Sequence, residues 1–198
     1  MSTESPWLLI FYQAPSEPSA LRVSVWRALK QLGAVKLRDG LYFLPDQPVC
    51  RGKLDDLRSR VHAGGGTAIT MTAQGSSPEN AACLDTLFAK ARAEDYRQVA
   101  KSALKFVAHV GREVEEGDYR FAEVDALEEE LEKVRRQFER ATGRDYLKSP
   151  AREDAAHAVA DAAASMGRYL ELAYRREAEP DETARPVKAP AGTRGGGR

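Results

Sequence analysis

Residues 35–44 read Val-Lys-Leu-Arg-Asp-Gly-Leu-Tyr-Phe-Leu, and this stretch decides the fold of the first part of the chain. Apolar and basic residues alternate over residues 35–38, and the following Asp39-Gly40 pair is a strong signal for a two-residue turn. An apolar run then returns over residues 41–44 and stops at a proline. The stretch therefore predicts an antiparallel hairpin.

A strand and a helix are expected on each side of this hairpin. Upstream, residues 7–12 form a short aromatic run typical of a buried strand. Apolar residues then recur at helical spacing up to a glycine that suits a helix end: Leu21, Val25, Leu29, Leu32 and then Gly33. Downstream, residues 53–62 have an amphipathic helical pattern and residues 67–72 a strand pattern. This order predicts an α+β fold, a ferredoxin-like βαββαβ module with both helices on one face of an antiparallel sheet, which we place in residues 1–75.

Long helices are predicted after residue 75. The first runs from Ser77-Pro78 toward Val110, with a break expected over residues 111–117. The second has apolar residues spaced alternately by three and four, the seam of a coiled coil: Val124, Leu127, Leu131, Val134 and Phe138. The third opens at Ser149-Pro150 and carries an inward stripe: Ala156, Val159, Ala160, Ala163, Leu170 and Tyr174. We predict a helical hairpin or bundle over residues 76–178 and a disordered tail, rich in proline, glycine and charge, over residues 179–198.

The composition excludes several classes of protein. The chain has 198 residues with 30 basic and 30 acidic side chains, so it has no net field that would attract nucleic acid or membranes. The apolar run of residues 7–12 is far shorter than the roughly 20 residues of a membrane span, and no basic region of a signal peptide precedes it. Two cysteines, Cys50 and Cys83, without a CxxC spacing favour a reducing cytoplasm.

Neither catalytic residues nor a cofactor is predicted from motifs. The three histidines, His62, His109 and His157, lack a cysteine or second histidine at metal-ligand spacing, so we interpret them as ordinary surface or packing residues. No GxSxG motif is present, and the glycines of residues 64–66 precede a strand, whereas a phosphate loop precedes a helix. We therefore expect no metal, no cofactor and no enzymatic activity.

Basic residues gather in the predicted α+β module. Residues 1–78 carry nine basic and six acidic side chains, a net charge of +3. Five of the basic residues flank the first helix and the next strand and form our candidate nucleic-acid site: Arg22, Arg27, Lys30, Lys36 and Arg38. Two interpretations stay open, contact with nucleic-acid phosphates and an ordinary surface or protein interface.

Several stretches together resemble one known family. They are residues 7–10 with Pro15, residues 22–34 (RVSVWRALKQLGA), residues 37–45 (LRDGLYFLP), residues 88–96 (FAKARAEDY) and residues 143–147 (GRDYL). Over roughly residues 6–150 the chain resembles the N-terminal domain of the chromate-resistance regulator ChrB. The run WRALKQLGA followed by a DGxYxLP hairpin carries most of this resemblance.

The resemblance implies transcriptional control of chromate efflux or detoxification, with DNA as a partner. It leaves chromate or another oxyanion as a possible ligand, and a homodimer as a possible assembly. The same module is similar to PaaX-type repressors and to small CRISPR-associated nucleases, which place an acidic metal ligand at the end of the first strand. Here that position reads Tyr12-Gln13-Ala14, and a neutral amide does not replace a carboxylate on Mg²⁺, so no nuclease activity is expected. The alternative hypothesis is a helical protein–protein interaction module that does not bind DNA.

Overall fold

The computed structural model describes residues 6–15, 17 and 19–178 of the chain. Strands β1 (Trp7–Gln13), β2 (Val35–Arg38), β3 (Leu41–Pro45) and β4 (Thr67–Ala73) form one sheet in the order β2-β3-β1-β4. All three strand pairs are antiparallel. Helices α1 (Ser19–Leu32) and α2 (Pro48–Ala63) connect them, which confirms the predicted α+β class and the βαββαβ order.

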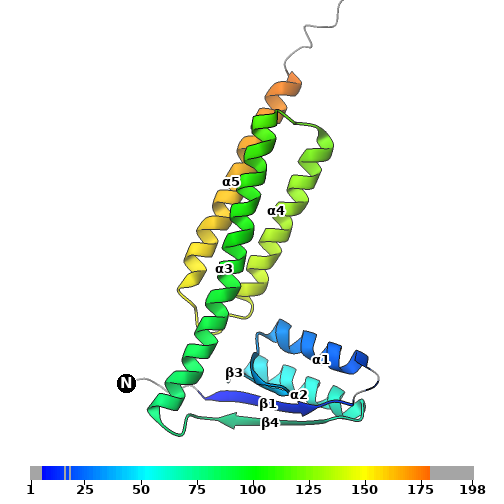
Figure 1. The fold of residues 1–198 in the computed structure, drawn as a ribbon, viewed down its shortest axis with the longest axis vertical. Coiled ribbons are helices and arrows are strands. Elements are labelled where there is room, and N and C mark those ends of the chain that lie inside the picture. Colours follow the sequence, from blue (N-terminus) through cyan, green and yellow to red (C-terminus); the bar gives the residue numbers. More distant parts are fainter. Residues whose placement is uncertain (1–5, 16, 18, 179–198) are drawn as a thin grey trace, which may run out of the picture.

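Both connecting helices cover the same face of the sheet (Figure 1). Ile10 of β1 packs there against Val25 and Leu29 of α1, all of them buried, as the helical spacing predicted. Helix α2 begins at Pro48, five residues earlier than expected, because proline suits the first turn of a helix. This extra turn brings Cys50 into the same core.

The hairpin turn is fastened to the neighbouring strand. Gly40 has left-handed backbone (φ 74°), and its carbonyl accepts a hydrogen bond of 2.8 Å from the backbone N–H of Tyr12. A Cβ atom at this position would lie 2.5 Å from the Tyr12 carbonyl oxygen. The glycine of the Asp-Gly turn is therefore required by backbone conformation and by space.

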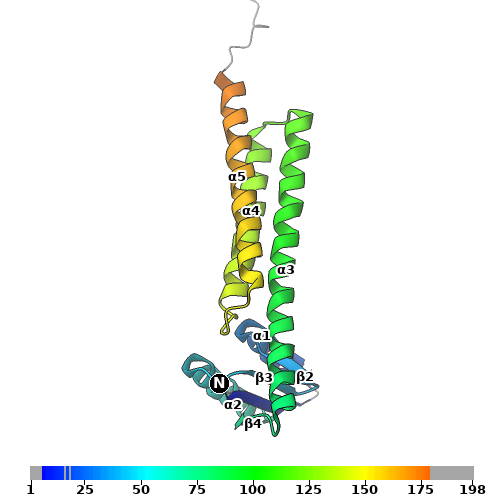
Figure 2. The same ribbon diagram turned by 90° about the vertical axis from the view of Figure 1, so that its left-hand side faces the viewer.

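Three long helices form a bundle that extends away from the sheet, α3 (Pro78–Glu116), α4 (Phe121–Thr142) and α5 (Ala151–Ala178) (Figures 1 and 2). Ser77 caps α3 by accepting a hydrogen bond from the Asn80 N–H, as predicted. The break expected over residues 111–117 begins only at its last residue: α3 runs through Gly111 to Glu116, and Gly117 (φ 68°) is its C-cap. An exposed glycine costs a helix only about 1 kcal/mol, and burial of Phe106 and Val110 outweighs that cost.

The inward faces of α4 and α5 follow the prediction to different extents. The heptad seam of α4 faces α3 and α5 of the same chain, with Leu127, Leu131 and Val134 buried, so it is not available to a partner helix. The stripe predicted for α5 was partly right, since Val159, Ala163 and Leu170 pack against the core, but it missed the centre of the packed face. Its buried members are Ala155, Ala162, Ser165, Met166 and Tyr169, whereas Ala160 and Tyr174 are exposed. Small residues surround this helix on several sides, so spacing alone did not identify the packed face.

The first turns of α3 cover part of the second face of the sheet. Trp7 of β1 contacts Phe43 of β3 and Phe88 of α3, with ring centroids 5.1 and 5.5 Å apart. Elements on either side of the predicted boundary near residue 75 therefore share a hydrophobic core. The tail predicted over residues 179–198 lies outside the described residues. Within the described ranges, no helix combines the length and the apolar character that crossing a membrane requires.

Candidate functional site

The five predicted nucleic-acid residues are all exposed, on two consecutive elements. Arg22, Arg27 and Lys30 lie on α1, and Lys36 and Arg38 lie on β2, which follows α1 after a two-residue connection. Lys36 forms an ion pair of 2.5 Å with Asp39, so an acid already partly neutralises its charge. We call this surface of α1 and β2, with Trp26, the basic edge.

An exposed tryptophan lies among the basic residues of α1. The side chain of Trp26 is 48% exposed, and the ammonium of Lys30 lies 5.1 Å from the centroid of its ring. Sequence reasoning did not select Trp26 as a site residue. The signal was present, because Trp26 lies outside the apolar stripe that faces the sheet. Exposed aromatic rings beside cations suit contact with nucleotide bases and phosphates.

A buried polar junction joins the α+β module to the bundle. Arg92 of α3 is only 5% exposed; it donates a 3.2 Å hydrogen bond to the Arg144 carbonyl and lies 3.2 Å from the Asp95 carboxylate. Tyr96 donates a 3.0 Å hydrogen bond to Asp145, in the connection between α4 and α5. These contacts bring together residues 88–96 and 143–147, two of the stretches that carry the family resemblance.

Tyr146 extends this junction to the end of α1. Its hydroxyl donates a 3.0 Å hydrogen bond to the Leu32 carbonyl, and burial raises its pKa well above the ordinary value. Burial likewise raises the pKa of the nearby Cys50 thiol. Gly33, with φ 78°, packs directly against Arg92 and Arg144. Because the Asp95 carboxylate already pairs with both arginines, the junction holds the two parts of the molecule together and is not an open anion site.

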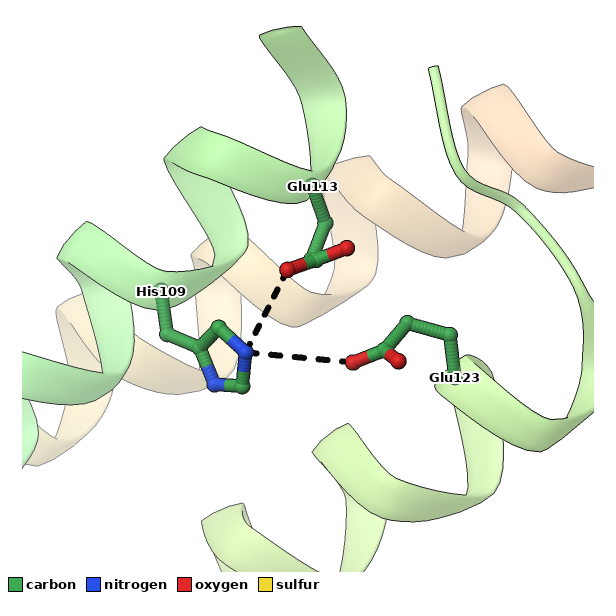
Figure 3. Close-up of side chains that lie close together, drawn as sticks. All are labelled: His109, Glu113 and Glu123. Atoms are coloured by element: carbon green, nitrogen blue, oxygen red, sulfur yellow. Dashed lines mark ion pairs between the residues drawn. The ribbon is translucent and has the colours of Figure 1, made fainter. Parts of the chain in front are cut away.

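A histidine and two glutamates converge between α3 and α4 (Figure 3), and a third glutamate, Glu130, lies against the other side of the histidine ring. His109 Nε2 lies 3.3 Å from Glu113 Oε1, one turn further along α3, and 3.8 Å from Glu123 Oε1 at the start of α4. His109 Nδ1 is 2.8 Å from Glu130 Oε2, within hydrogen-bonding distance. One ligand atom each from His109, Glu113 and Glu123 lies within 4.8 Å of the others, so these three residues could hold a metal ion.

Sequence reasoning missed this cluster. The four-residue spacing of His109 and Glu113 on one helix face was visible, but such pairs are common on solvated helices. The contributions of Glu123 and Glu130 depend on how α4 folds back against α3. A prediction from spacing alone therefore had no means of bringing the third and fourth side chains to the histidine.

Comparison with known proteins identifies the family to which the chain belongs. The family model described as "Protein ChrB, N-terminal" matches residues 22–180. The chain belongs to this family. Protein ChrB of Cupriavidus metallidurans (strain ATCC 43123 / DSM 2839 / NBRC 102507 / CH34) is 34% identical over 87 residues, which cover 44% of this chain and 27% of that protein. No solved structure matches. The predicted resemblance to the ChrB N-terminal domain is thus confirmed, over about a quarter of the relative's length.

Proposed function

We propose that this chain is a DNA-binding regulatory protein of chromate resistance. Membership of the ChrB family supports the link to chromate. The observation that carries the DNA-binding part is the basic edge, where α1 carries exposed cations and the Lys30 ammonium lies over the ring of a half-exposed Trp26. Phosphates would pair with the cations, and the indole ring offers a flat apolar contact.

A salt titration tests DNA binding with a matched control. The variant R27A/K30A/R38A removes three positive charges from the basic edge, and K90A/K101A/K105A removes three from exposed positions of α3. Each phosphate contact contributes about 0.9 to the slope of log affinity against log salt, so the first variant should lose about 2.7 from the slope. Between 50 and 200 mM salt, the wild type would lose about 40-fold more affinity than this variant.

The assay is fluorescence anisotropy with a labelled duplex from the promoter of the operon that encodes the chain. The basic-edge variant should bind weakly with a flattened salt dependence, and the α3 variant should bind like the wild type. Equal losses of DNA affinity in both variants would mean that binding depends only on the total charge of the protein, and the proposal would be wrong. Thermal melting of both variants controls for folding, since exposed substitutions usually cost within about 0.5 kcal/mol each.

Catalysis forms no part of the proposed function. Gln13 at the end of β1 offers no carboxylate where related nucleases place a metal ligand. Incubation with Mg²⁺ or Mn²⁺ and labelled duplex should leave the DNA intact.

We propose chromate or another oxyanion as an effector, bound by this chain or by a partner.

A protein-interaction role is the second candidate, supported by the far end of the bundle. An open cavity of about 700 Å³ lies there between the α3–α4 connection and α5. Phe121 and Tyr174, which line it, are 74% and 68% exposed. If the basic-edge variant binds DNA as well as the wild type, an apolar partner at this end becomes the better explanation.

A further inference from the structure

The cluster of His109, Glu113, Glu123 and Glu130 has the arrangement of a metal centre with a supporting residue. Tetrahedral zinc sites have metal–ligand bonds of about 2.0–2.2 Å, which places neighbouring ligand atoms about 3.4 Å apart. The separations of 3.3 and 3.8 Å between His109 Nε2 and the two nearest carboxylate oxygens are close to this value. A single ion therefore fits among these three atoms with small side-chain movements.

Glu130 gives the histidine the orientation that a metal ligand needs. His109 Nδ1 lies 2.8 Å from Glu130 Oε2, and because a carboxylate only accepts, a hydrogen bond here has Nδ1 as the donor and leaves Nε2 on the side of Glu113 and Glu123. Histidines that bind metals characteristically donate their second ring nitrogen to a carboxylate or carbonyl. The cluster therefore contains three ligand atoms and the residue that orients one of them.

The charges of the cluster also favour a cation. Glu113 and Glu123 have side chains only 14% and 22% exposed, so water screens them incompletely. In the part of the chain that the structure describes, no lysine or arginine forms an ion pair with the three glutamates. Arg120 is paired with Asp118 and acts on Glu113 and Glu123 only from a greater distance. A protonated histidine would supply one positive charge against three negative ones. A divalent ion compensates the half-buried carboxylates more completely.

We propose that His109, Glu113 and Glu123 bind one divalent transition-metal ion, with Zn²⁺ as the preferred physiological ion, and that Glu130 positions His109. The imidazole nitrogen favours zinc over Mg²⁺ and Ca²⁺, which prefer all-oxygen sites. Three protein ligands leave a fourth position for water. The ion would clamp α3 to α4 beside their connection, at the end of the bundle away from the basic edge (Figure 1), so this inference does not depend on DNA binding.

Zinc titration of the full chain tests the proposal. The experiment uses chelator-treated protein carrying Cys83→Ser, so that the exposed thiol does not bind metal, and isothermal calorimetry with ZnCl₂. We expect one zinc per chain, with affinity at least 100-fold lower in the His109→Ala variant. Glu130→Gln should weaken binding about 10- to 100-fold, the usual effect of losing a residue that supports a ligand. The matched controls Glu128→Gln on α4 and His157→Ala on α5 should bind as the parent does.

Several outcomes would overturn the proposal. They are the absence of zinc binding to the parent, equal affinity in parent and His109→Ala, and Mg²⁺ binding as tight as Zn²⁺, which would indicate a mere acidic surface. Circular dichroism in chelator establishes that each variant is folded. If His109→Ala does not fold, the nearly isosteric Glu123→Gln replaces it, and unchanged zinc affinity in that variant is equally contradictory.

Discussion

Gly33 lies at the junction between the α+β module and the bundle, and its replacement by alanine should strongly destabilise the protein. Its φ of 78° is unfavourable for a residue with a side chain, by about 1–2 kcal/mol. The added Cβ would lie 2.5 Å from Arg92 Nη1 and 2.7 Å from Arg144 Cβ. Arg92 would have to move and lose its bond to the Arg144 carbonyl, a charged hydrogen bond worth about 1.5–3 kcal/mol.

These contributions add to about 2–4 kcal/mol once the lower entropy of the unfolded alanine chain is subtracted, about 0.4–1 kcal/mol. Gly117 is the matched control, because it has a φ of 68° but nothing within 4 Å of the position of a Cβ. Gly117→Ala should therefore cost about 1 kcal/mol, from backbone conformation alone.

Urea unfolding measures both variants with two signals. Tryptophan fluorescence reports the α+β module, which contains both tryptophans, Trp7 and Trp26, and far-ultraviolet circular dichroism reports mainly the bundle. In the wild type the two transitions should coincide, and in Gly33→Ala the fluorescence transition should come first. Equal losses of stability in the Gly33 and Gly117 variants would refute the reasoning, because the close approach to Arg92 would then have no energetic effect.

Two further predictions concern other polar contacts. Tyr146→Phe leaves the Leu32 carbonyl without its side-chain donor and should lower the free energy of unfolding by about 1–2 kcal/mol in urea titration; an unchanged value would contradict the role of the hydroxyl. Hydrogen bonds from Arg120 lower the pKa of Asp118 from 3.8 to about 2, so its contribution to stability is full above pH 4 and disappears as the pH falls toward 2. Between pH 4 and pH 2, the free energy of unfolding should therefore fall less in Asp118→Asn than in the control variant Asp125→Asn. Identical pH profiles for the two variants would contradict this prediction.

Local patterns in the sequence were sufficient for the order of elements in the α+β module and for the start of α3. The turn at Asp39-Gly40, the apolar stripe of α1 and the Ser77 cap of α3 all depend on residues within a few positions of one another. Backbone preferences and burial of one helix face determine such features, and both can be read from spacing. The exposure of the basic residues of α1 follows from the same stripe.

The arrangement of the long helices required the tertiary structure. The continuation of α3 through Gly111 and the packed face of α5 depend on contacts between helices that outweigh small local preferences. The same holds for the polar clusters. Arg92 meets Arg144 across 52 residues of sequence, and His109 meets Glu130 across 21. Charged residues are so frequent in these helices that many pairings are compatible with the sequence. Only the fold-back of α4 and α5 along α3 selects those that form, because only there do the side chains come within bonding distance and lose much of their water.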